Sequence, residues 1–175
     1  MRPYTEADQN MCLQLYSAVE KARQIPPDYV DEFTETLNDK DVLTLVGVMN
    51  EELVACGSIN YYQDIRAAFL SYGLVHPEKQ KMGIGSIMLI TRIALLASDK
   101  DHPCYVYMSA TSHSRPFFTK VVGFGEESHD LDEYGNIFHN LYLPLSDQLL
   151  KSSRRHLSKI QMQFDWDIEV PIKLS

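Results

Sequence analysis

The chain has 175 residues, of which 45% are hydrophobic, and a formal net charge of −8. This length suffices for one well-packed core and does not require two, so we expect a single domain. An acidic chain has no global positive field that would collect phosphates. The composition therefore argues against a nucleic-acid partner and favours a neutral or cationic small one.

The three cysteines, Cys12, Cys56 and Cys104, lie far apart and show no spacing typical of a disulfide framework or a zinc site. We expect no metal site and interpret the thiols as buried groups in a reducing cytosol. The first residues lack the apolar run of a signal peptide, and no apolar stretch approaches the roughly 20 residues that a membrane span needs. The sequence thus predicts a soluble, cytoplasmic protein without a membrane partner.

The N-terminal part predicts two helices. Thr5 can cap the first one, because an acidic residue follows three positions later and apolar residues then recur at helical spacing. Pro26 and Pro27 end this helix, and the acidic segment 28–33 predicts a second one. Three strands follow, because β-branched residues become frequent. These strands are expected at 42–49, 53–59 and 67–75.

The rest of the first 145 residues alternates between helix and strand. A helix that is apolar on nearly all sides is expected at 86–97, a strand at 104–110, a short helix at 114–122, and an antiparallel pair at 125–129 and 137–143. This order implies an α/β fold of the α+β type, in which helices lie on the faces of a mixed sheet.

A C-terminal extension, residues 146–175, is set apart from the domain at 1–145. It predicts a locally basic amphipathic helix, followed by an apolar alternation from Trp166 to Leu174 that predicts one more strand. We expect the extension to pack on the same domain or on a partner subunit. Because an unpaired apolar strand favours association, a homodimer through this tail is one hypothesis.

The loop Gln80-Lys81-Met82-Gly83-Ile84-Gly85 lies between a predicted strand and a predicted helix. Amides at a helix start carry partial positive charge, and glycines let phosphate oxygens approach the backbone, so the loop is suited to a pyrophosphate. It lacks the Gly-Lys-Ser/Thr of a P-loop and the three glycines of the dinucleotide fingerprint. Tight packing of strand against helix is the alternative reason for such glycines.

The segment from Val75 to Ser86 resembles the signature of the GNAT superfamily of acyl-CoA-dependent N-acetyltransferases. That signature is Gln or Arg, two residues, Gly, any residue, then Gly or Ala. Residues 117–124 resemble the family's later helix, which ends in Gly-Phe, and the resemblance covers about residues 1–145. It implies a mostly antiparallel central sheet flanked by helices. It also implies acetyl-CoA as co-substrate and direct acetyl transfer, in a ternary complex, to a primary amine of a small molecule or peptide.

Carried over residue by residue, the resemblance implies a coenzyme site. The backbone amides that would hold the pyrophosphate belong to Met82, Gly83, Ile84, Gly85 and Ser86. Gln80 and Lys81 would shape the loop, although solvated side chains are an equal alternative. The backbone at Leu74 and Val75 would run beside the pantetheine arm and orient the acetyl carbonyl.

Two positions that carry catalytic residues in the family are filled differently in this sequence. The fourth strand offers Phe69, Ser71 and Gly73 where a Glu often supplies the base, and the later helix holds Thr119 where a Tyr often supplies the acid. Candidate proton donors are Tyr107, Ser112 and Thr119. The alternative is that Tyr107 is a half-buried sheet residue and Ser112 a helix cap.

Three functional hypotheses remain. The first is the amine acetyltransferase, and the acidic stretch 126–133 is either its attraction for an ammonium group or ordinary solvated surface. The second is a non-catalytic acyl-CoA-binding or regulatory module that has lost acid and base. The third is an interaction protein that uses its C-terminal tail.

Overall fold

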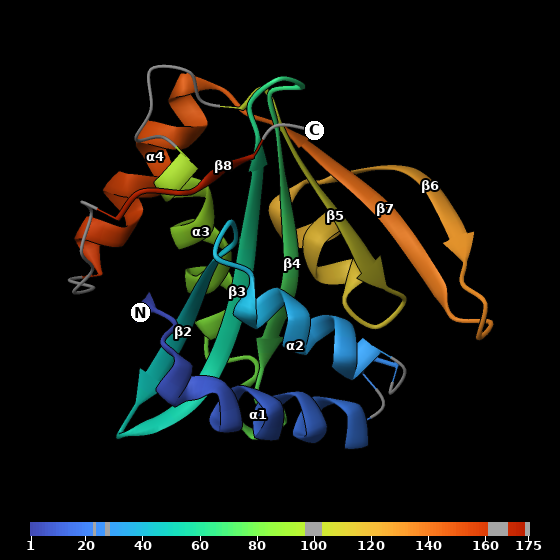
Figure 1. Ribbon diagram of the computed structural model, residues 1–175. Helices are drawn as coiled ribbons and strands as arrows, with labels where there is room; N and C mark the ends of the chain where they lie inside the picture. The colour runs from blue at the N-terminus through green and yellow to red at the C-terminus, as the bar shows by residue number, and fades with distance from the viewer. Residues whose placement is uncertain (23, 27–28, 97–102, 161–167, 174–175) are drawn as a thin grey trace.

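A mixed sheet of eight strands forms the centre of the computed structural model, which describes residues 1–22, 24–26, 29–96, 103–160 and 168–173 (Figure 1). The strands are β1 (Arg2–Pro3), β2 (Leu43–Met49), β3 (Glu52–Tyr62), β4 (Ala67–Val75), β5 (Tyr105–Thr111), β6 (Gly125–Leu131), β7 (Ile137–Pro144) and β8 (Ile172–Lys173). Their order is β1-β2-β3-β4-β5-β7-β6, with β8 paired to β3. Only β4–β5 and β3–β8 pair in parallel.

Helices cover both faces of this sheet (Figure 1). The helices are α1 (Gln9–Lys21), α2 (Val30–Asn38), α3 (Ile84–Leu95) and α4 (Asp147–Lys159), with short turns η1 (Glu6–Asp8), η3 (Pro77–Lys79) and η5 (Phe117–Val122). One buried cluster joins α1 and α2 to the sheet, and a larger one joins α3, α4 and η5 to it. The predicted α+β class with a mostly antiparallel sheet between helices is therefore confirmed.

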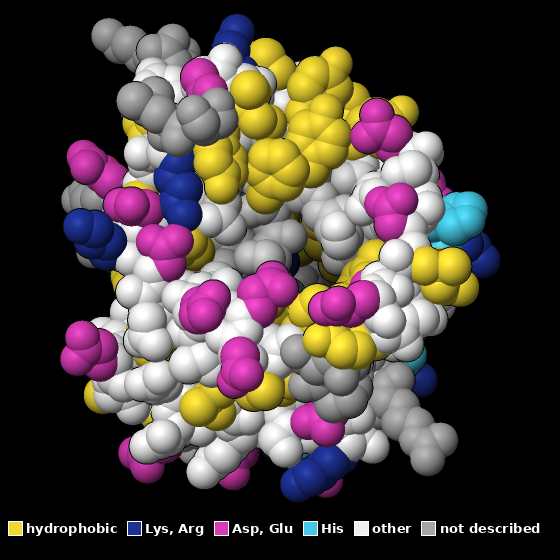
Figure 2. All heavy atoms as spheres, turned by 45° about the vertical axis from the view of Figure 1, so that its right-hand side comes forward, with side chains coloured by type: hydrophobic (Ala, Val, Ile, Leu, Met, Phe, Trp, Pro, Cys, Tyr) yellow, Lys and Arg dark blue, Asp and Glu magenta, His cyan; other side chains and the backbone are white. Residues whose placement is uncertain are grey.

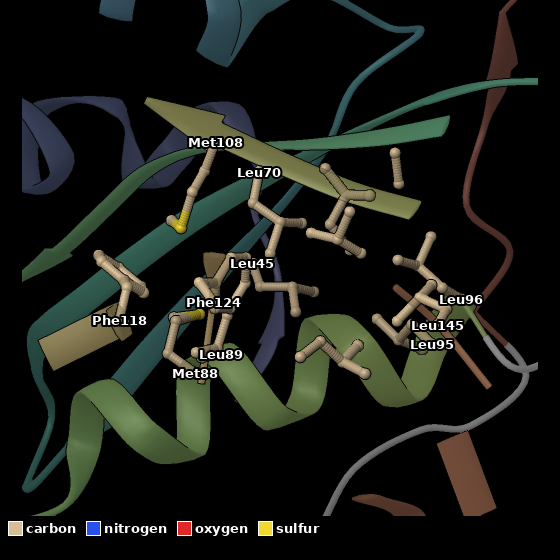
Figure 3. Close-up of a cluster of buried hydrophobic side chains, with 14 of the residues drawn as sticks. Leu45, Leu70, Met88, Leu89, Leu95, Leu96, Met108, Phe118, Phe124 and Leu145 are labelled. Atoms are coloured by element: carbon tan, nitrogen blue, oxygen red, sulfur yellow. The ribbon is translucent and has the colours of Figure 1, made fainter. Parts of the chain in front are cut away.

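The larger cluster fixes α3 against the sheet (Figure 3). Met88 and Leu89 of α3 are 1% exposed and belong to one cluster with Leu70 of β4, Phe118 and Phe124. Full burial of each such side chain stabilises the fold by roughly 1.5–3 kcal/mol. Since the glycine loop directly precedes α3, this packing also fixes the loop against the end of β4.

The extension continues the same core through α4. Leu150 and Leu157 are buried, and Arg154 Nε donates to the Ala94 carbonyl of α3 at 3.1 Å. Helix α4 thus packs on its own domain. Of the strand predicted from Trp166 to Leu174, only Ile172 and Lys173 are paired, while residues 161–167 and 174–175 lie outside the described residues.

Three features differ from the sequence-based expectations. Strand β1, which pairs with β2 through two residues, is too short to give a periodicity signal. The predicted helix at 114–122 becomes a six-residue π-helix, η5, whose wider turn ends at Gly123 with a φ of 92°. Helix α3 begins at Ile84 and so includes Gly85.

None of the described helices combines the length and the apolar run that crossing a bilayer demands.

Candidate functional site

The sheet opens where β4 and β5 separate. These strands pair only over Ala67–Phe69 and Tyr105–Tyr107, and beyond this point they diverge (Figure 1). The edge of β4 from Leu70 to Val75 therefore has no strand partner on the β5 side. Unpaired backbone groups need other partners, so an extended ligand arm with amide groups can bind along this edge.

A cleft of about 1240 Å³ occupies this opening. Its volume exceeds the roughly 300–1,000 Å³ of common small-molecule pockets and is large enough for a long ligand together with a second substrate. Figure 2 shows the hollow, with acidic side chains around it and a hydrophobic patch beside it. The lining comes from the segment between α1 and α2, from β4 and β5, from the glycine loop and α3, from η5, and from the β6–β7 hairpin.

The glycine loop borders one end of the cleft. Gly83 is the N-cap of α3 with a φ of 84°, and Lys81 also has a positive φ of 61°. A Cβ added to Gly83 would meet nothing within 4 Å, so the backbone is open on that side. The first helical bond runs from Ile87 N to Gly83 O. The amides of residues 82–86 find no acceptor among the described residues, which fits an anion cradle.

Gln80 links this loop to two other parts of the chain. Its Nε2 donates to the Val75 carbonyl at 3.1 Å and to Gln24 Oε1 at 2.5 Å. The half-buried side chain therefore ties the loop to the end of β4 and to the segment after α1. Lys81 and Met82 are exposed, and Lys81 lines the cleft.

The three predicted proton donors occupy different environments. Tyr107 lines the cleft and stacks on Phe69, with ring centroids 5.5 Å apart. Ser112 and Thr119 are not among the lining residues: the Ser112 hydroxyl lies 3.3 Å from His139 Nε2, and the Thr119 hydroxyl donates to the Arg115 carbonyl at 3.0 Å. Of the three predicted residues, Tyr107 is therefore the one that the structure places in the cleft lining.

Two tyrosines elsewhere in the cleft wall, Tyr29 and Tyr72, carry no distinguishing sequence pattern. The Tyr29 hydroxyl donates to Asp132 at 2.5 Å and so connects the start of α2 with the β6–β7 turn. Hydrogen bonds from Tyr29 and Asn136 lower the pKa of Asp132, although desolvation acts the other way. Burial and the nearby Glu32 carboxylate raise the pKa of Tyr72, which keeps this phenol protonated.

Glu32, Asp130 and Asp132 all line the cleft, so this wall is acidic. Of these groups, only the acidic stretch 126–133 could be predicted, because the approach of α2 to the hairpin depends on tertiary packing. The same cleft thus contains these carboxylates and, at the glycine loop, a run of free amides. This arrangement is suited to an anionic, extended ligand on one side and a cationic group on the other.

A parted sheet, a run of free amides and an acidic wall therefore meet around one cleft of an α+β fold. The profile of the Acetyltransferase (GNAT) family matches residues 10–124. The chain therefore belongs to this family and is an acyltransferase. The resemblance seen in the signature segment is confirmed.

Solved structures agree with this fold. The ribosomal-protein-S18-alanine N-acetyltransferase from Escherichia coli has a TM-score of 0.66 at 16% identity, covering 82% of this chain and 92% of that one. A spermidine N-acetyltransferase variant from Vibrio cholerae has a TM-score of 0.61 at 19% identity, covering 86% of this chain and 98% of that one. An aminoglycoside 6'-N-acetyltransferase complexed with coenzyme A has a TM-score of 0.62 at 12% identity, covering 82% of this chain and 95% of that one. No curated protein matches the chain in sequence.

Proposed function

We propose that the protein transfers an acetyl group from acetyl-CoA to a primary amine of a small molecule or peptide in a ternary complex. The observation that carries this proposal is the run of free amides at 82–86, placed beside the unpaired edge of β4. The coenzyme's pyrophosphate needs donors at a helix start, and its pantetheine amides need an unpaired strand edge. Both are present, and they adjoin.

The glycine loop and the end of β4 bind the acetyl donor. Amides of residues 82–86 hold the pyrophosphate, and the Gln80 side chain keeps the loop against Val75. The backbone of Leu74 and Val75 runs beside pantetheine and orients the thioester carbonyl. Acetyl-CoA supplies the activated acyl group, and the chain's part is to hold that group facing the acceptor. The coenzyme A bound to the aminoglycoside enzyme supports this choice of donor.

The acceptor enters from the acidic wall. Glu32, Asp130 and Asp132 attract its ammonium form, and a carboxylate acting through water takes up the proton. The neutral nitrogen then attacks the thioester carbonyl carbon. Its lone pair forms the C–N bond while the C=O electron pair moves to oxygen. Collapse of this intermediate re-forms the C=O bond and breaks the C–S bond, so the thiolate leaves and takes up a proton, while the nitrogen releases its second proton to water. The solved neighbours named above act on a protein alanine, a polyamine and an aminoglycoside, which supports an amine without choosing one.

Tyr107 is the predicted donor that lines the cleft, and we assign it the proton that the departing thiolate takes up. Tyr107→Phe keeps the ring that stacks on Phe69 and removes only the hydroxyl. We expect kcat to fall by about 10²-fold with unchanged coenzyme affinity, in the range typical of general acids. An unchanged kcat would remove Tyr107 from this role.

The test of the function is a thiol-release screen with acetyl-CoA across polyamines, aminoglycosides, amino acids, sugar amines and peptide N-termini. Release of one thiol per acetylated amine supports the proposal. Coenzyme binding without release from any amine would favour the non-catalytic module, for which the missing carboxylate on β4 is the motivating observation. The homodimer stays a prediction, and sedimentation of the full chain tests it.

A further inference from the structure

Arg92 is a buried cation in the apolar helix α3. Its side chain is 1% exposed, and none of the ion pairs among the described residues includes it. Nη1 donates to the carbonyls of Ser58 and Ser71, both at 3.3 Å, whereas Nε has no partner. Burial lowers the pKa of Arg92 to about 10, so the guanidinium stays charged at neutral pH.

The chain makes room for this group with two glycines. A Cβ on Gly57 of β3 would lie 3.0 Å from the guanidinium carbon, and one on Gly73 of β4 would lie 2.9 Å from Nη2. Both strands are irregular here: the β3–β4 register shifts between Cys56 and Ser58, and Tyr72 has a φ of 46°. The guanidinium therefore occupies a gap beneath the distorted part of β4.

This gap adjoins the cleft. Arg92, Gly73 and Leu74 are all lining residues, and Nη2 makes no hydrogen bond with any described residue. A charge buried without a counterion is costly, and even buried ion pairs can often be replaced by apolar side chains without loss of stability. The bonds to the two carbonyls use only Nη1, so packing alone gives no full reason for an arginine here. A positive potential in a low-dielectric site does, because it stabilises negative charge that develops nearby.

We propose that Arg92 is an electrostatic positioning residue that polarises the acyl thioester carbonyl through the distorted segment of β4, an inference that rests on the proposed function. It holds the Ser71 carbonyl and thereby the backbone that follows at Gly73. Its charge also favours the step in which the amine nitrogen bonds to the carbonyl carbon and the C=O electron pair moves to oxygen. When the C–S bond breaks, the same field favours the thiolate.

The test measures the carbonyl itself and needs no acceptor. Acetyl-CoA labelled with ¹³C at the carbonyl is bound to wild type, Arg92→Met and Arg92→Lys, and isotope-edited difference infrared spectra are recorded. In wild type we expect the thioester stretch below its position in solution. Arg92→Met returns most of that shift and Arg92→Lys only part of it, while the Kd of acetyl-CoA changes by less than about threefold.

Two further readouts separate this role from a purely structural one. Arg92→Met should melt no lower than wild type, and with an identified acceptor its kcat should fall about 10- to 100-fold. If Arg92→Met does not fold, Gly73→Ala replaces it, because the added methyl group displaces Nη2 and keeps the charge. Its band should then move toward the solution position.

The outcomes are distinct. Acetyl-CoA bound with the same carbonyl band in wild type and in the folded variants overturns the role of Arg92 and leaves the proposed function standing. Absence of acetyl-CoA binding to wild type overturns both.

Discussion

Gly83 is the residue on which the proposed coenzyme site depends most. Its φ of 84° lies in the left-handed region, where an L side chain is strained, and its open side lies beside the free amides of the loop. The role proposed for this glycine follows from its spacing and its position between a strand and a helix, both of which the sequence shows. The left-handed conformations of Lys81 and Tyr72 could not be predicted, since neither residue type favours positive φ.

Gly83→Val tests the loop at the residue scale. We expect coenzyme A affinity, measured by calorimetry, to fall by at least about tenfold, because a branched side chain blocks the approach of phosphate to the amides. Gly135→Val is the matched control: its φ is 83°, it too is open on the Cβ side, and it lies in the β6–β7 turn. Equal losses of affinity in both variants would mean that strain alone, not phosphate contact, explains the effect.

At the scale of elements, periodicity predicted the helices and strands whose apolar faces are long. Helix α3 could be predicted because its residues are apolar on nearly all sides. The same pattern indicates no role for the arginine within it. The distortion at Gly57 and Gly73 left no signal, because it depends on a side chain from another element. For the same reason the bond between Tyr29 and Asp132, 103 positions apart, could not be read from the sequence.

The N-terminal cap provides a pH-dependent prediction. Asp8 accepts from Arg2 through both oxygens at 2.6 Å and from the Thr5 amide at 2.9 Å, and the Arg2 bonds chiefly lower the pKa of Asp8 to about 2. A depressed pKa stabilises the fold above the ordinary value of about 3.9, and this contribution is lost as pH falls toward 2. The Arg2–Asp8 pair thus ties strand β1 to the start of helix α1.

Asp8→Asn should therefore lower the free energy of unfolding by about 1–2 kcal/mol at pH 7, a value reduced because Arg2 is 45% exposed. The difference from wild type should shrink as the pH falls from about 4 to about 2, as urea titrations at each pH would record. Asp41→Asn, at an exposed position, should change stability by less than about 0.5 kcal/mol. A pH-independent difference for Asp8→Asn would count against the ion pair.

For the whole molecule, the extension from Ser146 is part of the fold through α4. Leu157 is 0% exposed and lies in the helix that packs on α3, whereas Leu131 at the end of β6 is 69% exposed. Leu157→Ala should cost about 2–5 kcal/mol in thermal or urea unfolding. The same change at Leu131 should stay within about 0.5 kcal/mol. Equal, small effects would mean that α4 contributes little to the stability of the domain.

The proposed binding of the coenzyme's pyrophosphate by the glycine loop is tested most directly by titrating the wild-type protein with coenzyme A and with pantetheine, which lacks the phosphates. We expect coenzyme A to bind one to one and pantetheine to bind at least about 100-fold more weakly, because only the former reaches the free amides at 82–86. Equal affinity for both ligands, or no binding of coenzyme A, would contradict a phosphate cradle at this loop.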